Sequence, residues 1–513
     1  MNDLIRFELS DDQVLMACID MPGRSMNVFS EALIDALQSL VDRVESDVCI
    51  KGVVLSSGKP SFLAGADLSM VLGMTERATS STVPQMFEYC GRLGRLFLRI
   101  EQSSKPWVAA VDGTALGGGL ELAMACRVRL IRPDAKALIG LPEVKLGLLP
   151  GAGGTQRLPR LIGLQFGLDL LLSGRSIDPA TAIAAGLFEA ITGDQSPLDA
   201  ARQRVHAINA RGTVQSAEKF AFAPLDLPPD QDSEIRALAV ANGLSESALR
   251  DYPAYRAIIK SVLTGGRLEM AQATDVEMTC FLDLMFNPVA ANMVSTLFLE
   301  RQRVEKNAAS LATQAPESIT LGPLSAPVNA WRDALLPTGI RITDDQALGM
   351  NQAEFRMSDG PLSRWQLSTA SGEFPDAQES NAKSVVGIPV LVLSERSEHG
   401  RVIEMTGDVA PGVVAALARK MRCLLILTPK GASLLQELTR AKLNASATPA
   451  ASVAPVTSAA SEIDLLADAA QRAMAAGRVI DPAALDVAAV LAGISPAYTG
   501  GPLRQARHPS RSL

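Results

Sequence analysis

The chain has 513 residues, of which 47% are hydrophobic and 20% charged, and its formal net charge is −7. This length predicts about three domains, and the composition excludes global disorder. The acidic balance argues against a nucleic-acid-binding protein, which would carry a basic stripe. The chain has only 3 histidines, His206, His399 and His508, so we expect carboxylates to carry any acid–base chemistry.

Cysteine usage and the chain ends predict a cytoplasmic protein. The 6 cysteines are scattered without a CxxC pair, which predicts reduced thiols and no metal site. Met1–Glu8 carries acidic residues and does not resemble a signal or transit peptide. The final Arg-Ser-Leu resembles the peroxisomal signal only superficially. No apolar run reaches the length of about 18 residues that a membrane span requires, so we expect none.

The first half of the chain alternates predicted strands and helices. Val14–Ile19 and Ile50–Ser56 are short aliphatic runs typical of strands. Apolar residues repeat between them with helical spacing after Ser30, which has the pattern of a helix N-cap. Trp107–Val111 predicts a further strand, which runs into a glycine cluster and a helix at Leu120–Ala125. This order predicts an α/β layered fold.

Three segments are candidates for the chemistry: Ser61–Asp67, Ala115–Glu121, and Leu141–Glu143 with its continuation to Arg157. The second segment has three consecutive glycines at a helix start, where backbone N–H groups are free to stabilise negative charge on an oxygen. Glu121 lies in the first turn of that helix, and Glu143 follows 22 positions later (143 − 121). Two carboxylates beside an oxyanion site suit the addition or removal of water at an activated thioester.

Each of these signals has a plainer interpretation when taken alone. A glycine triplet is most often tight packing, and a glutamate in a first helical turn most often complements the helix dipole. Gly151–Gly154 lacks the lysine of a phosphate loop and the spacing of a dinucleotide fingerprint, so it predicts a turn.

Taken together, the segments resemble the crotonase (enoyl-CoA hydratase/isomerase) superfamily over roughly the first 190 residues. The resemblance is carried by Ala64–Asp67, Ala115–Ala123, Gly140–Glu143 and Pro150–Arg157. It implies a crotonase-like ββα spiral domain that acts on acyl-CoA thioesters.

The resemblance also implies roles for individual residues. The backbone N–H groups of Ala66 and Gly118 would form the oxyanion hole. Glu121 would activate water, and Glu143 would exchange the proton at the α carbon. Because many relatives keep only one acid or neither, the presence of both favours a hydratase.

Coenzyme A recognition is assigned to residues near the same site. The segment containing Ala64 and Asp67 resembles the part of the family that lies against the CoA adenine. Arg24, in the loop Pro22–Asn27, is a candidate cation for the CoA phosphates. Three methionines of residues 68–100 are either lining of an acyl channel or ordinary core: Met70, Met74 and Met86.

The second half resembles multifunctional fatty-acid-oxidation proteins, in which a connecting helix leads from the hydratase to an NAD-dependent 3-hydroxyacyl-CoA dehydrogenase. Asn287–Met293 and Leu297–Arg301 resemble that helix. At the expected GxGxxG turn only Gly322 remains, with Leu324 and Pro327 at the other two glycine positions. The resemblance therefore implies a degenerate dehydrogenase that binds no NAD, and no cofactor is expected.

The remaining dehydrogenase positions support the same prediction. Glu404 matches the family's catalytic glutamate, whereas the expected histidine falls on Val392 and the expected asparagine on Leu435. Arg401–Met405, Val413–Lys420 and Leu424–Thr428 keep a strand–helix–strand rhythm. The alternative is that residues 311–440 are unrelated to the dehydrogenase and similar only by chance.

We expect five regions along the chain. These are a crotonase-like catalytic core at residues 1–190, a helical region with the connecting helix at 191–310, a degenerate Rossmann-like domain at 311–440, a flexible linker at 441–462 and a remnant helical C-terminal module at 463–513.

The expected activity is that of a 2-enoyl-CoA hydratase, a lyase, whose dehydrogenase activity has been lost. The alternatives are a Δ3–Δ2 enoyl-CoA isomerase, which needs mainly Glu143, and a hydratase whose C-terminal half is a scaffold for a thiolase-type partner. Simple crotonases form trimers, whereas the multifunctional family uses its connecting helix in place of a neighbour, so a homo-oligomer and a thiolase complex both stay open.

Overall fold

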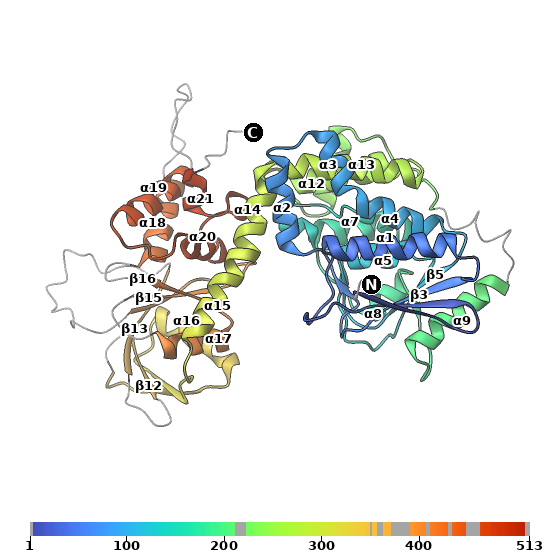
Figure 1. The fold of residues 1–513 in the computed structure, drawn as a ribbon. Coiled ribbons are helices and arrows are strands. Elements are labelled where there is room, and N and C mark those ends of the chain that lie inside the picture. The colour runs from blue at the N-terminus through green and yellow to red at the C-terminus, as the bar shows by residue number, and fades with distance from the viewer. Residues whose placement is uncertain are drawn as a thin grey trace, which may run out of the picture. The chain divides into compact units, whose positions relative to one another are not determined.

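The computed structural model describes residues 4–210, 222–348, 351–356, 363–370, 390–406, 411–428, 433–447 and 462–507. The chain forms two compact units, Met1–Ala291 and Asn292–Leu513 (Figure 1). The units divide inside helix α14 (Pro288–Val294), so the predicted core 1–190 and the following helices up to Ala291 belong to one unit.

Unit 1 contains two sheets. The larger has the order β1(Ile5–Leu9), β2(Val14–Ile19), β3(Gly52–Ser57), β5(Trp107–Val111), β7(Val128–Ile131), β9(Glu189–Ala190). Strand β1 is antiparallel to β2, and every other neighbouring pair is parallel. The smaller is a parallel sheet of β4(Leu63–Ala64), β6(Ala115–Leu116) and β8(Ile139–Gly140). The strands predicted at Val14–Ile19 and Trp107–Val111 are confirmed.

Helices cover both faces of the larger sheet. The helices of unit 1 are α1(Glu31–Ser46), α2(Leu68–Ala78), α3(Val83–Cys90), α4(Arg92–Gln102), α5(Gly118–Ala125), α6(Gly154–Ile162), α7(Leu164–Ser173), α8(Pro179–Ala184), α9(Pro197–Ala210), α10(Asp232–Ala241), α11(Glu246–Asp251), α12(Pro253–Gly265) and α13(Met270–Met285), with a 3-10 turn at Glu143–Leu146. The hydroxyl of Ser30 accepts from the Leu33 N–H at 3.3 Å, which confirms the predicted N-cap of α1.

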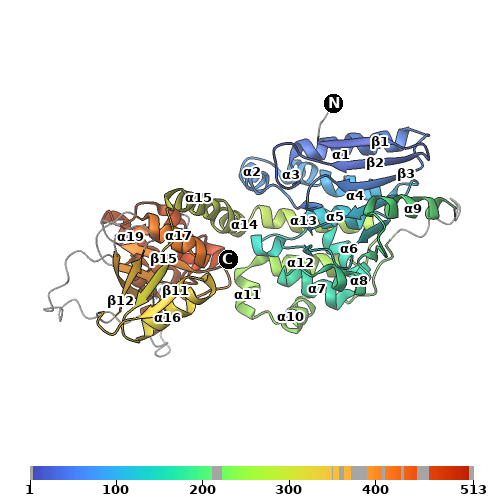
Figure 2. The ribbon, with the colours of Figure 1, turned by 90° about the horizontal axis from the view of Figure 1, so that it is seen from below.

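Segments beyond residue 190 complete the core of unit 1. Helix α9 lies on one side of the larger sheet, opposite α1 and α4 (Figure 1), and its Ala201 and Val205 are buried against Val54 and Val108. Figure 2 shows α12 and α13 beside α6. The region 191–291 therefore covers one face of the larger sheet through α9 and packs against α6 through α12 and α13.

The small parallel sheet brings the three predicted site segments together. Ala64 pairs with Leu116, and Leu116 pairs with Gly140, each as the last residue of its strand. The chain continues from these ends into Gly65–Asp67, into the Gly117–Gly119 triplet, and into Leu141–Glu143. Because the strands are parallel, all three segments leave the same edge of the sheet, which is where α/β folds place their sites.

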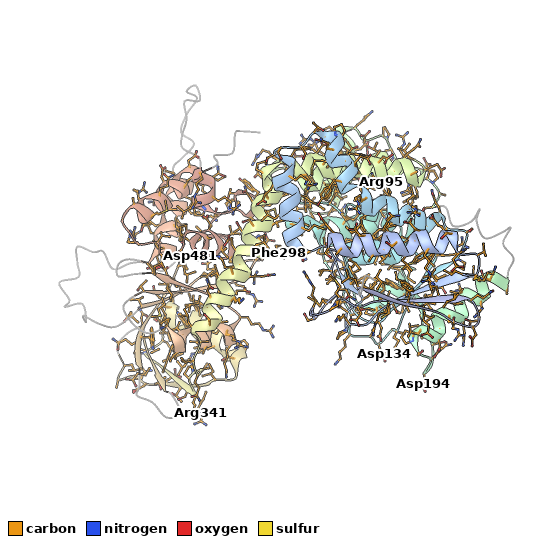
Figure 3. The ribbon with its side chains drawn as sticks, in the orientation of Figure 1. Arg95, Asp134, Asp194, Phe298, Arg341 and Asp481 are labelled. Atoms are coloured by element: carbon orange, nitrogen blue, oxygen red, sulfur yellow. The ribbon has the colours of Figure 1, made fainter. Side chains whose placement is uncertain are left out.

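Unit 2 begins in a helix that runs from Pro288 to Leu311. It consists of α14, a π-helical turn at Ser295–Glu300 and α15(Arg301–Leu311), and Phe298 of the turn is labelled in Figure 3. The sheet of unit 2 has the order β11(Arg341–Asp344), β10(Ser318–Leu321), β12(Gln352–Arg356), β13(Ser363–Thr369), β14(Val390–Leu393), β15(Val402–Thr406), β16(Leu424–Thr428). The helices after α15 are α16(Ala326–Leu335), α17(Gly412–Met421), α18(Leu434–Ala447), α19(Glu462–Ala475), α20(Pro482–Leu491) and α21(Pro502–Arg507), with 3-10 turns at Leu336–Thr338 and Ala497–Thr499.

The sheet of unit 2 is mixed rather than fully parallel. The predicted strand–helix–strand rhythm at 401–428 is confirmed, because β15 and β16 are parallel neighbours joined through α17. Strands β10 and β11 are likewise parallel around α16. The pairs β10–β12, β12–β13 and β14–β15 are antiparallel. Residues 394–401, which join β14 to β15, are too short for the crossover of a dozen or more residues that a parallel connection needs.

The predicted flexible linker at 441–462 is wrong at its start. Residues 441–447 are the last two turns of α18, and Glu462 already begins α19. This stretch is rich in alanine, which favours helix, and Lys442 Nζ donates to the carbonyl of Gly493 at 2.7 Å. Residues 448–461 of the predicted linker lie outside the described residues. The remnant C-terminal module belongs to the same compact unit as the sheet.

Within the described ranges, no helix taken singly is long and apolar enough to cross a membrane. Two consecutive helices, Met270–Met285 and Pro288–Leu311, meet the length and composition of a span only in combination, and they are bent by 76° at the break.

Candidate active site

In the glycine turn before α5, neighbouring side chains lie very close to the backbone. Gly117 has a φ of +53°, and a Cβ atom on it would lie 2.6 Å from Oε1 of Glu143. A Cβ atom on Gly118 would lie 2.9 Å from Cδ2 of Phe29. Both positions therefore exclude side chains, because the Glu143 carboxylate and the Phe29 ring pack closely against the backbone of the turn.

The two segments predicted to supply the oxyanion amides lie against each other. A Cβ atom on Gly117 would be 3.5 Å from Cα of Gly65. The N–H of Gly117 donates to the carbonyl of Gly140 at 2.9 Å. Across the described residues, the N–H groups of Ala66 and Gly118 donate to no protein acceptor. These two amides therefore keep the hydrogen-bonding capacity that an oxyanion hole requires.

Glu121 lies in the first turn of α5 and is fully buried. Its Oε1 accepts from the N–H of Ala152 at 2.8 Å and from the N–H of Gly154 at 2.7 Å. Burial raises the pKa of Glu121, and these two hydrogen bonds and the charge of Arg157 lower it in part. The turn Gly151–Gly154 is thus more than the plain turn predicted, because its amides hold a carboxylate.

Glu143 is the first residue of the 3-10 turn that follows β8. Its Oε2 is buried and has no hydrogen-bond partner in the described part of the chain. Burial, and next the negative charge of Glu121, raise the pKa of Glu143 well above its ordinary value. The site therefore pairs a carboxylate whose charged form is hydrogen-bonded with one whose neutral form is favoured, the arrangement of a general base and a general acid.

A third buried carboxylate, Glu277 of α13, was missed by the sequence analysis. It accepts from the N–H of Gly153 and from both the N–H and the hydroxyl of Thr155. Burial and the charge of Glu121 raise the pKa of Glu277 to about 8. The one signal in the sequence is a charged residue at helical spacing from apolar Ala273.

A buried ion pair also holds the turn Gly151–Gly154. Nε of Arg157 contacts Oε2 of Glu101 at 2.7 Å, and both side chains are buried. Nη1 of Arg157 donates to the carbonyl of Ala152 at 2.7 Å. The guanidinium of Arg157 therefore binds a backbone carbonyl of the turn, whereas the carboxylates of Glu121 and Glu277 bind its backbone N–H groups.

The residues predicted to contact CoA lie on two neighbouring segments. Ala64 ends β4 and is half-buried. Nη1 of Arg24 is 2.9 Å from Oδ2 of Asp67 in an ion pair, in which the Arg24 side chain is 48% exposed. Arg24 thus already shares its charge with a carboxylate, and the CoA contacts of the three residues stay predictions. In the described ranges no group of three or more His, Cys, Asp or Glu side chains could hold a metal ion.

The dehydrogenase-like positions of unit 2 come together around Glu404. Val392 is its direct antiparallel partner on β14. The Glu404 carboxylate accepts from the Thr428 and Ser433 hydroxyls and from the N–H groups of Leu434, at 2.8 Å, and Leu435, at 3.0 Å. The carboxylate therefore binds the start of α18 and faces valine where the resemblance expects histidine.

The turn after β10 offers few amides to a phosphate. The Gly322 N–H donates to the carbonyl of Gln352 at 2.8 Å. Ser325 caps α16, with its hydroxyl accepting from the Val328 N–H at 3.2 Å. Pro327 has no N–H, and Leu324 is 69% exposed at the position of the second glycine.

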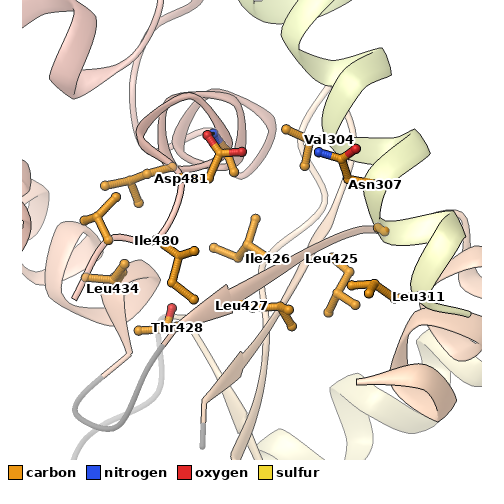
Figure 4. Close-up of a pocket in the computed structure, with 14 residues that line it drawn as sticks. Val304, Asn307, Leu311, Leu425, Ile426, Leu427, Thr428, Leu434, Ile480 and Asp481 are labelled. Atoms are coloured by element: carbon orange, nitrogen blue, oxygen red, sulfur yellow. The ribbon is translucent and has the colours of Figure 1, made fainter. Parts of the chain in front are cut away.

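Unit 2 also contains an apolar pocket of about 200 Å³ (Figure 4). Its walls include Val304 and Leu311 of α15, Leu425–Thr428 of β16, and Ile480 before α20. Thr428 connects the pocket to the buried Glu404 carboxylate through its hydroxyl, at 2.6 Å.

Unit 1 has the features of a crotonase-class domain. These are the parallel three-stranded sheet, the glycine turn and the paired glutamates. Residues 12–239 match the family model described as enoyl-CoA hydratase/isomerase, so this part of the chain belongs to that superfamily.

Curated relatives extend the similarity beyond residue 239. The fatty acid oxidation complex subunit alpha of Idiomarina loihiensis is 38% identical over 293 residues, which cover 57% of this chain and 40% of that protein. The protein of the same name from Shewanella amazonensis is 33% identical over 322 residues, covering 62% and 44%. The chain thus spans less than half the length of these relatives.

Solved structures with similarity to the chain include DspI from Pseudomonas aeruginosa and an enoyl-CoA hydratase from Bacillus anthracis. The first is 28% identical with a TM-score of 0.37, covering 42% of this chain and 84% of that one. The second is 24% identical with a TM-score of 0.37, covering 54% and 90%.

Proposed function

We propose that the protein is a 2-enoyl-CoA hydratase, which adds water across the α,β double bond of an acyl-CoA thioester. The observation that carries the proposal is the pairing of Glu121, held by two amides, with Glu143, whose Oε2 has no donor in the described part of the chain. Both lie beside the Gly117–Gly118 turn, where a Cβ on Gly118 would be 3.9 Å from Oε2 of Glu121.

The proposed reaction uses each group once. The N–H groups of Ala66 and Gly118 donate to the thioester carbonyl oxygen and stabilise the negative charge that develops there. Ionised Glu121 takes a proton from a water molecule as the oxygen of that water bonds to the β carbon. Protonated Glu143 then gives its proton to the α carbon, and the double bond is consumed. The product is a 3-hydroxyacyl-CoA.

The environments of the two glutamates support this assignment. Burial raises the pKa of Glu121, but two hydrogen bonds and the charge of Arg157 oppose this shift and favour the charged form that a base needs. Burial and the neighbouring charge of Glu121 raise the pKa of Glu143, which favours its protonated form and suits an acid. For the CoA moiety, Ala64, Asp67 and Arg24 are the proposed contacts.

We further propose that unit 2 has lost dehydrogenase activity and binds no NAD. Leu324 and Pro327 fill two positions at which the fingerprint needs glycine. The Gly322 and Val328 amides are bonded within the protein. Val392 cannot act as a base, and Glu404 is engaged by four donors. The residues of this turn therefore do not fit a dinucleotide pyrophosphate.

The decisive experiment is a hydration assay on a chain-length series of 2-enoyl-CoAs with the wild type, Glu121→Gln and Glu143→Gln, run beside an NAD-dependent oxidation assay. Hydration by the wild type and its loss in both variants supports the hydratase. Isomerisation of 3-enoyl-CoA that survives Glu121→Gln but not Glu143→Gln supports the isomerase instead. Oxidation of 3-hydroxyacyl-CoA with NAD would contradict the loss of the dehydrogenase.

The proposed setting is the cytoplasm, with no membrane span and no nucleic acid as partner. Unit 2 would serve as a scaffold for a thiolase-type partner. Size-exclusion chromatography with light scattering on the full chain, alone and mixed with a purified thiolase, tests this role. A mass equal to one chain in both samples would contradict the thiolase complex and a homo-oligomer alike.

A further inference from the structure

The turn before α6 is held by two carboxylates that take its amides in alternation. Glu121 accepts from Ala152 and Gly154, whereas Glu277 accepts from Gly153 and Thr155. Four consecutive N–H groups at a helix N-terminus thus have acceptors from two helices, α5 and α13. Such amides have no partner within their own helix, so buried carboxylates bind them strongly.

Glu277 is itself held in place. The hydroxyl of Thr155 donates to it and lies 2.8 Å from the hydroxyl of Ser261 on α12. Nε2 of Gln156 donates to the carbonyl of Ser261 at 2.9 Å. Helices α12 and α13 therefore both support the turn, and Glu277 is 1% exposed.

The position of Glu121 depends on this turn. Both hydrogen bonds to its Oε1 come from the turn, and a Cβ atom on Gly154 would lie 2.8 Å from that oxygen. A shift of the turn therefore shifts the carboxylate. Displacements of about 1 Å at a reacting group can cost on the order of 100-fold in rate.

We propose that Glu277 is a positioning residue of the active site: by binding the Gly153 and Thr155 amides, it fixes the turn that aims Glu121 at its water. The inference rests on the proposed hydratase activity and assigns to α13, outside the predicted core 1–190, a part of the catalytic geometry. Glu277 touches no reacting atom and acts only through the turn and through its charge.

The charge of Glu277 has a separate effect on Glu143. It is one of the charges that raise the pKa of Glu143. Because its own pKa is about 8, Glu277 carries this charge only as pH rises through about 8. Its removal therefore lowers the pKa of Glu143 in that pH range, and the alkaline limb of the kcat profile moves to lower pH, because Glu143 must be protonated to act.

The test compares the full-length wild type with Glu277→Gln in steady-state hydration of a 2-enoyl-CoA across pH. An amide side chain cannot accept at both oxygens, so one turn amide loses its partner. We expect kcat to fall by roughly 10- to 100-fold with KM changed less than about threefold, and the alkaline limb to move to lower pH. Unchanged kcat and an unchanged pH profile would overturn the proposal.

Asp275→Asn is the matched control, because it removes one negative charge from an exposed position on the same helix. It should leave kcat, KM and the profile at wild-type values. Equal effects of the two variants would show that Glu277 has no special role and overturn the proposal.

If Glu277→Gln does not fold, Thr155→Val provides a second test, because it removes the hydroxyl that donates to Glu277. It should also lower kcat, and wild-type kcat in this variant would count against the proposal.

Hydrogen exchange separates a failure of this inference from a failure of the proposed function. In Glu277→Gln, peptides covering residues 151–156 should exchange at least about tenfold faster, while those of β2 stay unchanged. This readout needs no substrate. A wild type inactive on every enoyl-CoA contradicts the hydratase, whereas wild-type exchange in residues 151–156 of the variant contradicts the positioning role.

Discussion

Glu121 and Glu143 differ in how their carboxylates are bonded, although both are buried beside the same glycine turn. Oε1 of Glu121 accepts two backbone hydrogen bonds, whereas Oε2 of Glu143 has no donor among the described residues. The negative charge of Glu121 also raises the pKa of Glu143. The pair is thus built to share one proton unequally, which predicts a bell-shaped pH dependence of kcat.

The different roles proposed for the two glutamates predict that their variants differ in α-proton exchange. In the proposed mechanism, Glu143 alone would exchange the α proton of a saturated acyl-CoA with D2O. We therefore expect Glu121→Gln to keep this exchange within about tenfold of the wild type while hydration falls by 100-fold or more. Glu143→Gln should lose both. The measurement is deuterium incorporation by mass spectrometry, and exchange that survives in Glu143→Gln would assign the proton to another group.

The crowding at Gly154 predicts a large effect of a single methyl group. In Gly154→Ala the Cβ would lie 2.8 Å from Oε1 of Glu121 and 2.6 Å from Cβ of Pro150. We expect a fall in kcat of roughly 100-fold because the carboxylate must move. Gly73→Ala is the control, since a Cβ there meets nothing within 4 Å and Gly73 lies inside α2. It should leave kcat unchanged, and equal kcat values for the two variants would contradict this account.

The bonding of Glu404 predicts that it stabilises unit 2. In Glu404→Gln at least one of its four donors loses its acceptor inside the protein. We expect a loss of roughly 3 kcal/mol of stability, as is typical of a broken buried charged network. Urea unfolding followed by hydrogen exchange in α18 measures it, with the exposed Glu395→Gln as control. Wild-type protection of α18 in Glu404→Gln would argue against a structural role.

Asp486 predicts a pH dependence of the stability of unit 2. It accepts from the N–H groups of Leu503, at 2.7 Å, and Arg504, at 3.0 Å. Burial raises the pKa of Asp486 from 3.8 to about 7. The folded state therefore binds the proton more tightly than the unfolded state.

The stabilisation that follows is fully present below about pH 4 and is lost as pH rises through about 7, with a slope of up to about 1.4 kcal/mol per pH unit. Unfolding of the wild type and Asp486→Asn between pH 4.5 and 7.5 measures this, and the slope should shrink in the variant. Asp468→Asn, exposed on α19, is the control. An equal slope in Asp486→Asn would remove Asp486 as the cause.

Local sequence patterns determined much of unit 1. The strand Trp107–Val111, the N-cap Ser30 and the glycine turn at Gly117 depend on residues close in the chain. They could be predicted because alternation, capping and glycine spacing are short-range effects. The two site glutamates were named from motifs for the same reason.

Connection lengths decided the sheet of unit 2. The segment 394–401, which joins β14 to β15, is too short for a crossover, so these two strands pair in antiparallel fashion where a Rossmann-like order was expected. The sequence had shown the strands and helices around 401–428, but not which edges they would share. Strand pairing is a long-range choice that short patterns do not encode.

The sequence by itself predicted a site of two carboxylates and a glycine turn, and it showed that Val392 and Leu435 stand where a dehydrogenase would have its histidine and asparagine, beside the matching Glu404. Only the tertiary structure decided that Val392 pairs with Glu404 on the adjacent strand. It also decided that Glu277, more than 120 positions beyond Thr155, binds the same turn as Glu121. A charged residue on an apolar helix face signals burial at most, and it does not identify its partners, because the amides that donate to this carboxylate are brought to it only by folding.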